Sequence, residues 1–350
     1  MKDKKTVFVL GAGASCPYGY PSGARLRKSI CLNQEFMQNY CDYLRNNKVD
    51  QADVIRRDVQ QFKDAFTKSS IKSIDIFMAN NPKLAPVGKY IIAFEVFSAE
   101  QKSRFREEAK LWQELSRNPP KSWTKTDSIL RREDFQGEDW CSYLYNRFIE
   151  GLIGRDVLPD FSIGDIAFIT FNYDRSLEYF LYESFSNSFT EVPESQVIQF
   201  LKNLKILHVY GQIMPLKWQD SNEGVDYKPQ EISESLLQKA AKNIKTIYEQ
   251  KESSELDEAR SLLKKAEQIF FLGFGYAPEN MEVLGLPGLI HPKCLIYGTA
   301  FNLIKEEAER IESAINHGRR KAQDYFDTRP TKIESDVDCL MLLRKYLILR

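Results

Sequence analysis

The feature that most constrains the fold is a short apolar run near the start of the chain that opens directly onto glycines. Thr6–Leu10 is apolar and partly β-branched, and Gly11–Ser15, with the sequence Gly-Ala-Gly-Ala-Ser, follows it. A buried parallel strand that ends in a glycine turn delivers backbone N–H groups to a phosphate. The usual third glycine is replaced by Cys16. The glycine pattern is therefore incomplete, and other residues must carry the functional argument.

Further short apolar runs recur along the chain with helical patterns between them. They are Ile166–Thr170, Leu204–Val209, Gln268–Leu272 and Lys293–Tyr297. Short continuous apolar runs are typical of strands that are buried on both faces of a parallel sheet. The alternation with helices predicts an α/β fold with a Rossmann-like parallel sheet.

The first two expected strands are separated by 155 residues, from Gly11 to Asp165. An ordinary crossover needs only about a dozen residues or more. The interval carries helical patterns at Gln34–Arg45, Ala52–Lys68, Ile71–Met78, Ser98–Leu115 and Trp140–Leu152. We expect residues 1–30 and 155–350 to form the nucleotide-binding domain and residues 31–154 to form a large helical insertion after the first strand. A smaller helical insertion is expected at about Ser233–Lys265.

Charge and hydropathy narrow the possible partners and the location. The chain has 49 Lys and Arg residues and 49 Asp and Glu residues, so its formal net charge is zero. Bulk attraction to nucleic acid or to an anionic membrane is absent, and we expect no direct nucleic-acid binding. The longest apolar runs are too short to cross a bilayer. The start of the chain lacks the pattern of a secretory signal, which predicts a cytoplasmic protein.

Cysteine and histidine spacing gives no metal-binding pattern. None of the six cysteines forms a C-x-x-C pair, and the three histidines are scattered. Zinc sites built from cysteine and histidine need such spacing. We expect no zinc and no other metal site.

Several segments together resemble one known family. Gly11–Pro21 resembles the nucleotide loop of the sirtuin family, Thr170–Asp174 resembles its T-Q-N-x-D element, and Leu207–Gly211 resembles the segment that holds its essential histidine. Leu272–Gly275 and Tyr297–Thr299 resemble the later strand ends that hold the adenosine half of NAD. The matches occur in family order and cover the nucleotide fold, not the helical insertion.

Two departures from the family bear on the activity. The four-cysteine zinc module of sirtuin deacetylases is missing, and Gly23-Ala24 replaces the family's Phe-Arg. The chain is more similar to the sirtuin-like proteins of bacterial antiphage defence, which destroy NAD. This resemblance implies an NAD+ hydrolase that depletes cellular NAD+ as the effector of abortive infection. Because such an activity must be gated, we also expect a homo-oligomer or a regulatory partner protein from the same defence system.

The resemblance implies roles for individual residues. Asn172 is expected to orient a water or a ribose hydroxyl, and His208 is expected to act as the base, since its ordinary pKa is near 6.5. The family's histidine directly precedes a glycine, a position that Tyr210 holds here, so both His208 and Tyr210 are candidates for it. Residues expected to bind the substrate NAD+ are Gly11, Ala12, Gly13, Ser15, Pro21, Asp174, Gly273, Gly275, Gly298 and Thr299.

Structural roles and other functions compete with this interpretation. Asp174 precedes a helical pattern, and Asp75 starts another, where an acidic residue commonly caps the helix. A catalytically silent sensor that binds NAD or ADP-ribose is one alternative function, and ADP-ribosyl transfer is another. A dehydrogenase is disfavoured, because no acidic residue ends a second strand about 20 residues after the glycines.

Overall fold

A six-stranded parallel sheet forms the centre of the computed structural model. The structure describes residues 4–32, 40, 42–43, 52–103, 139–150, 152, 157–159, 165–247, 249, 253–301, 303–323, 329 and 331–349. The strand order is β3-β2-β1-β4-β5-β6, and every neighbouring pair is parallel. The strands are β1 (Thr6–Leu10), β2 (Ile166–Thr170), β3 (Lys205–His208), β4 (Gln268–Leu272), β5 (Leu295–Thr299) and β6 (Thr331–Glu334). The expected α/β fold with a parallel sheet is confirmed.

The sixth strand was not expected from the sequence. β6 lies at the edge of the sheet beside β5 and has four residues, of which Thr331 and Ile333 are buried. So short a run, with only two apolar or β-branched residues facing inward, gives a weak alternation signal.

The buried side chains of the strands alternate between two cores. Phe8 stacks between Phe168 of β2 and Phe270 of β4, with ring centroids 5.1 and 5.5 Å away, because the three residues share one register. Successive side chains of a strand point to opposite faces, so Val7 and Val9 enter the second core. A sheet that is buried on both faces explains why its strands read as continuous apolar runs.

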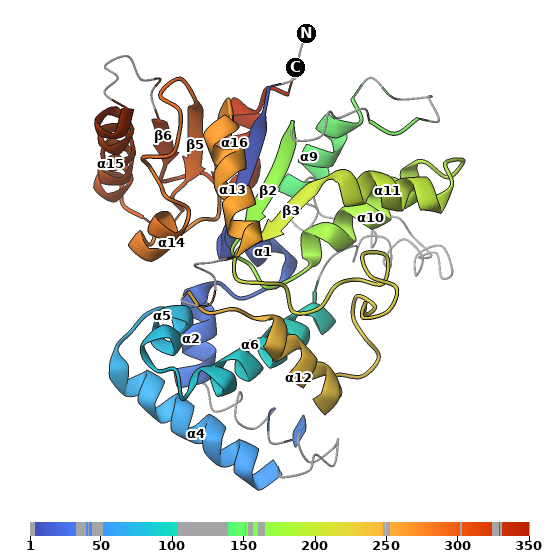
Figure 1. The fold of residues 1–350 in the computed structure, drawn as a ribbon, viewed down its shortest axis with the longest axis vertical. Helices are drawn as coiled ribbons and strands as arrows, with labels where there is room; N and C mark the ends of the chain where they lie inside the picture. Colours follow the sequence, from blue (N-terminus) through green and yellow to red (C-terminus); the bar gives the residue numbers. More distant parts are fainter. Residues whose placement is uncertain are drawn as a thin grey trace, which may run out of the picture.

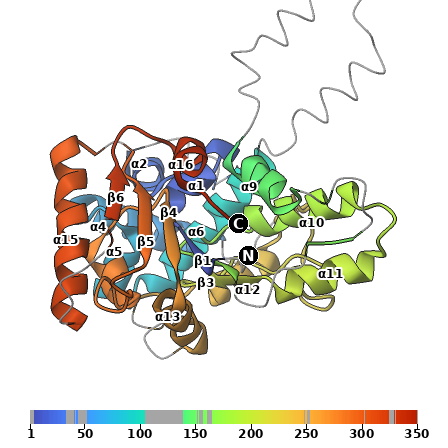
Figure 2. The same cartoon turned by 90° about the horizontal axis from the view of Figure 1, so that it is seen from above.

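Helices cover both faces of this sheet. α13 (Ser254–Lys265) and α15 (Lys305–Gln323) pack on the side of Val7 and Val9. α9 (Trp140–Phe148), α10 (Ser176–Ser188) and α16 (Cys339–Tyr346) pack on the side of Phe8. Figure 2 shows α9 and α16 on one side of the sheet and α13 on the other. α11 (Glu194–Asn203) packs against α10, and α14 (Pro278–Val283) follows β4. The result is a doubly wound three-layer arrangement.

A separate helical layer lies beyond the carboxyl ends of the strands (Figure 1). It contains α2 (Gly23–Leu32), α4 (Ala52–Ser69), α5 (Ile74–Asn80), α6 (Ala85–Gln101) and α12 (Glu234–Asn243). α12, from the smaller insertion, packs against α6. α9 was expected within the insertion, but it packs against α10 and α16 beside the sheet. The helical layer is therefore assembled from segments that are not contiguous in the chain.

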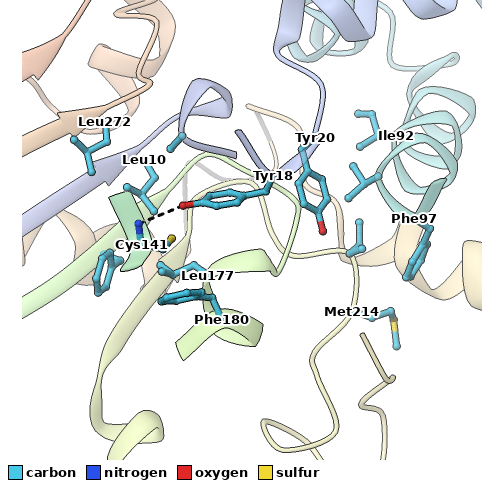
Figure 3. Packing of buried hydrophobic residues seen from close by; sticks show 14 of the residues in the cluster. Leu10, Tyr18, Tyr20, Ile92, Phe97, Cys141, Leu177, Phe180, Met214 and Leu272 are labelled. Carbon is cyan, nitrogen blue, oxygen red and sulfur yellow. Dashed lines mark hydrogen bonds between the residues drawn. The ribbon is translucent and has the colours of Figure 1, made fainter. Parts of the chain in front are cut away.

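One apolar core joins the sheet to the helical layer. Figure 3 shows buried side chains that extend from Leu10 at the end of β1, past Tyr18 and Tyr20, to Ile92 and Phe97 of α6. These five residues belong to a single cluster. Burial of this apolar surface holds the helical layer against the carboxyl edge of the sheet.

The bounds of α6 differ from the expected helix at Ser98–Leu115, of which residues 104–115 lie outside the described residues. α6 begins earlier, at Ala85, and is apolar on most of its surface. In the described parts of the chain, no helix is both long and apolar enough to span a bilayer.

Candidate functional site

The polar residues singled out from the sequence gather at the carboxyl edge of the central strands. The chain order reverses between β1 and β4, because β2 and β3 lie on one side of β1 whereas β4, β5 and β6 lie on the other. In open α/β sheets, ligands bind at such a switch point, outside the carboxyl ends of the strands. The segments after β1, β2 and β4 meet there.

The glycine turn after β1 packs directly on the turn after β4. The Gly11 N–H donates to the Leu272 carbonyl and the Gly13 N–H to the Gly273 carbonyl, both at 3.0 Å. A Cβ on Gly11 would lie 2.5 Å from the Gly273 oxygen, and a Cβ on Gly273 would lie 2.1 Å from the Ala14 nitrogen. These glycines are required for the close approach of two backbones. The Gly11 and Gly13 amides, which we expected to face phosphate, are bonded instead to the end of β4 and to the turn that follows it.

A one-turn helix, α1 (Ala12–Ser15), continues from this turn. Ala12 opens this helix, and the Trp140 indole N–H of α9 donates to the Ala14 carbonyl at 2.8 Å. Pro21 lies half-buried in the segment before α2. The turn is thus held from one side by β4 and from another by α9.

Asn172 is fixed at the centre of the site. Its side-chain amide donates to the Gly11 carbonyl at 3.0 Å and to the Ser15 hydroxyl at 2.9 Å. Its backbone N–H donates to the Thr170 hydroxyl at 3.0 Å. The residue is only 8% exposed, and its Oδ1 is buried without a hydrogen-bond partner. A buried amide oxygen without a partner is costly, so this atom is an acceptor that a water or a ligand hydroxyl would satisfy.

Asp174 links the Asn172 segment to the next helix. Its Oδ1 accepts from the backbone N–H of Ser176 at 3.1 Å and also from the Ser176 hydroxyl. Burial raises the pKa of Asp174, while hydrogen bonds from Ser176 and Ser15 act in the opposite direction. The carboxylate thus forms an Asx turn at the start of α10 and also faces Ser15.

His208 reaches the same segment from β3. Its Nδ1 lies 2.9 Å from the Asn172 carbonyl oxygen, and its Nε2 lies 2.6 Å from Oε1 of Glu178. The Gln212 amide donates to the same Glu178 oxygen at 2.9 Å. Burial lowers the pKa of His208, but Glu178 and the Asn172 carbonyl together raise it by more, so the pKa lies above its ordinary value. Both ring nitrogens are occupied, which differs from the expectation of a free base.

Tyr210 faces a different element from His208. β3 ends at His208, and Tyr210 lies in the following turn, so the two side chains do not share the face that an extended strand would give them. The Tyr210 hydroxyl donates to Oδ1 of Asn280 in α14 at 2.8 Å, and burial raises the pKa of Tyr210. Its ring packs edge-on against Phe171 at 5.4 Å.

The ends of β4 and β5 form the other half of the site. The Thr299 hydroxyl accepts from the Gly273 N–H at 2.8 Å and so fixes the turn after β4. A Cβ on Gly298 would lie 2.0 Å from the Tyr276 hydroxyl, so the Tyr276 side chain covers Gly298. That hydroxyl is buried and has no hydrogen-bond partner. A Cβ on Gly275, by contrast, would have no neighbour within 4 Å.

The residues that connect this site to the helical layer include Asp75, which the sequence indicated as a helix cap, and Tyr173, Arg175 and Glu100, which sequence reasoning missed. Asp75 of α5 accepts from the Tyr173 hydroxyl, and burial raises its pKa. Ser73, not Asp75, is the N-cap of α5. Arg175 forms two hydrogen bonds to Glu100 of α6, at 2.9 and 2.8 Å. Their position beside Asn172 in the chain is the only sequence signal that could have drawn attention to Tyr173 and Arg175.

Glu178 was missed for another reason. It lies in the first turn of α10, where an acidic residue ordinarily reads as favourable to the helix dipole. The structure buries it and directs it at His208.

No group of three or more His, Cys, Asp or Glu residues suited to a metal ion occurs within the residues that the structure describes. The polar groups of the site are an amide, hydroxyls, a carboxylate–imidazole pair and backbone groups. Comparison of the chain with protein-family models, with curated proteins and with solved structures found no match. The functional argument therefore depends on the residues themselves and on their geometry.

Proposed function

We propose that the protein is an NAD+ hydrolase that releases nicotinamide from ADP-ribose. In this reaction the bond between nicotinamide nitrogen and ribose C1′ breaks, and nicotinamide leaves as a neutral base with the electron pair. Water adds to the oxocarbenium-like C1′ and loses one proton. The chemistry is related to glycoside hydrolysis, but the leaving group needs no acid because it is already cationic in the substrate.

The observation that carries this proposal is the unpartnered Oδ1 of Asn172. Its amide nitrogen is committed to Gly11 and Ser15, which fixes the direction in which the oxygen points. An acceptor held in this way can orient a water molecule or a ribose hydroxyl without reorganising during the reaction. The resemblance of Thr170–Asp174 to the sirtuin T-Q-N-x-D element supports the same role.

A second buried polar group without a hydrogen-bond partner lies on the β4–β5 side of the switch point. The Tyr276 hydroxyl, buried over Gly298 at the end of β5, also has no partner. An extended dinucleotide crosses the carboxyl edge of a doubly wound sheet and contacts both halves. Unsatisfied polar groups on both halves are consistent with such a substrate. NAD+ would be contacted by the segments that contain Asn172 and Asp174 on one side and Gly273, Gly298 and Thr299 on the other.

The cellular role follows from the resemblance to antiphage proteins. We propose that NAD+ loss is the effector step of abortive infection in the cytoplasm, and that assembly or a partner protein gates it. The helical layer is the proposed contact, because it covers the carboxyl edge of the sheet. Size-exclusion chromatography combined with activity measurements tests this gating, and full, constant activity of an isolated monomer would contradict it.

The catalytic proposal is tested with the purified full chain and NAD+. Nicotinamide and ADP-ribose should appear in equal amounts, and Asn172→Ala should lower kcat by about 100-fold or more, the usual effect of removing a fixed polar group at a reacting centre. Asn222→Ala, which changes an exposed loop amide, is the matched control and should leave the rate unchanged. Equal activity of wild type and Asn172→Ala would refute the site.

The same assay separates the two alternatives. Tight NAD+ binding by calorimetry, without turnover in any assembly state, would favour a sensor. NAD+ labelled in its ADP-ribose half would become covalently attached to a macromolecule if the reaction were ADP-ribosyl transfer.

A further inference from the structure

His208 lies between two hydrogen-bond acceptors. One is the Asn172 backbone carbonyl, 2.9 Å from Nδ1, and the other is Oε1 of Glu178, 2.6 Å from Nε2. Glu178 is buried, and the His208 side chain is nine-tenths buried. Neither acceptor can move far, because Asn172 is bonded to the β1 turn and Glu178 lies within a helix.

With an ionised Glu178 carboxylate, a neutral imidazole cannot satisfy this arrangement. It carries one N–H, so one of its two nitrogens would present a lone pair to an oxygen lone pair. The imidazolium form has two N–H donors and satisfies both contacts. The charged groups that face it favour the imidazolium form: Glu178 is in direct contact, and Asp174 acts at longer range. The uncharged amide of Gln212 donates to the same Glu178 oxygen.

We propose that His208 is not the base of the reaction but a fixed cation, and that it and Glu178 are positioning residues for the Asn172 segment. This inference rests on the proposed NAD+ hydrolase activity and specifies how its site is held. Glu178 holds the imidazolium, the imidazolium holds the Asn172 carbonyl, and the Asn172 side chain is thereby fixed for its ligand. The proton released when water adds to C1′ passes to solvent, so the reaction needs no histidine base.

The two roles of His208 predict opposite pH profiles. If the imidazolium is the active form, kcat/KM is highest below the pKa of His208 and falls as pH rises through it. If His208 is a base, kcat/KM falls as pH decreases through the same pKa. Glu178→Gln removes the charge that stabilises the imidazolium, so the alkaline loss should begin at lower pH in that variant.

The second test replaces His208 with glutamine, whose side-chain amide can donate a hydrogen bond but cannot act as a base. His208→Gln retains an N–H donor and should keep kcat/KM within about 10-fold of wild type, whereas His208→Ala should lose about 100-fold. A general base contributes about 100- to 10,000-fold, and glutamine would not replace it, so a base role predicts equal losses for both variants. His317→Gln, on the exposed face of α15, is the matched control.

A titration that does not depend on activity separates this inference from the proposed function. The chain has three histidines, so nitrogen NMR of the imidazole-labelled protein can follow His208, assigned by its absence in His208→Gln. The inference is supported if wild-type His208 keeps two N–H signals above pH 6.5, whereas His208 in Glu178→Gln keeps both signals only at lower pH. A neutral His208 at pH 6.5, or an acidic loss of kcat/KM, would overturn the inference. No NAD+ loss from wild type would refute the proposed function instead, and the titration would still decide the state of His208.

Discussion

Arg175 and Glu100 form the buried ion pair that connects the segment after β2 to the helical layer, and it gives the sharpest stability prediction. Both side chains are 0% exposed. Arg175 donates to both carboxylate oxygens of Glu100 and also to the carbonyls of Pro215, Val225 and Asp226, at 3.2, 2.8 and 2.6 Å. One guanidinium thus satisfies five acceptors, two on Glu100 and three on backbone carbonyls between Pro215 and Asp226.

Arg175→Met is expected to lower the free energy of unfolding by about 3–5 kcal/mol, the range found when one partner of a buried pair is removed. Most of this loss of stability comes from the polar groups that remain buried without the Arg175 guanidinium. Among the described residues, the Glu100 carboxylate keeps the Lys228 backbone N–H, at 2.8 Å. The carbonyls of Val225 and Asp226 lose the Arg175 donor, whereas the Pro215 carbonyl keeps the Val225 N–H at 2.9 Å. Adding Glu100→Met removes the uncompensated charge, so the double variant should be more stable than Arg175→Met alone despite its extra substitution.

Urea denaturation of the full chain measures these differences. The matched control is the exposed pair of Lys217 and Asp226, whose side chains are 63% exposed and 2.6 Å apart. Lys217→Met should change the free energy of unfolding by less than about 1 kcal/mol. The reasoning is refuted if the free energy of unfolding of Arg175→Met lies within about 1 kcal/mol of the wild-type value. It is also refuted if the double variant loses the sum of the two single losses.

Three further predictions concern the glycines and a buried carboxyl near the site. Gly273→Ala, at φ +58° with a Cβ clash against backbone, should destabilise the protein by more than about 1 kcal/mol in thermal melting, whereas Gly275→Ala should change it little. Gly298→Ala should also destabilise the protein, because the new Cβ would lie 2.0 Å from the Tyr276 hydroxyl. Adding Tyr276→Phe removes that oxygen and should restore stability. A double variant as unstable as Gly298→Ala would contradict this packing. Burial raises the pKa of Asp75, so ionisation of this carboxyl lowers the stability of the wild type as pH rises through that pKa. The free energy of unfolding of Asp75→Asn, measured by urea denaturation, should therefore increase relative to wild type between about pH 4 and pH 8. A difference that stays constant over this range would contradict the prediction.

The central strands could be predicted from sequence because their physics is local. β1, β2 and β4 have the bounds that the apolar runs give, since strands buried on both faces need apolar residues throughout. α6 could not be located in the same way. Its residues, including Ile91, Ile92 and Phe94, are buried around most of the helix, so no polar stripe marks its period.

The site was predictable in its position but not in its contacts. Parallel strands bring their carboxyl ends to one edge, which is enough to place Asn172 near Gly11. It does not reveal that the Gly11 amide is bonded to β4, because that bond depends on how closely the two turns pack. Likewise, the sequence indicates that His208 lies near Asn172, but not that its ring contacts Glu178, a contact that raises its pKa.

The four residues 172–175 show why such contacts matter for the whole molecule. Their side chains contact, in order, the β1 turn, α5, the start of α10 and α6. Two of these contacts, those of Tyr173 with Asp75 and of Arg175 with Glu100, join the segment to the helical layer. A displacement of that layer must therefore break one of these contacts or move the segment, because a buried carboxyl and a buried charge are costly to leave unpaired. The helical layer thus has a direct physical route to the Asn172 amide, which is what gating by a partner or by assembly requires.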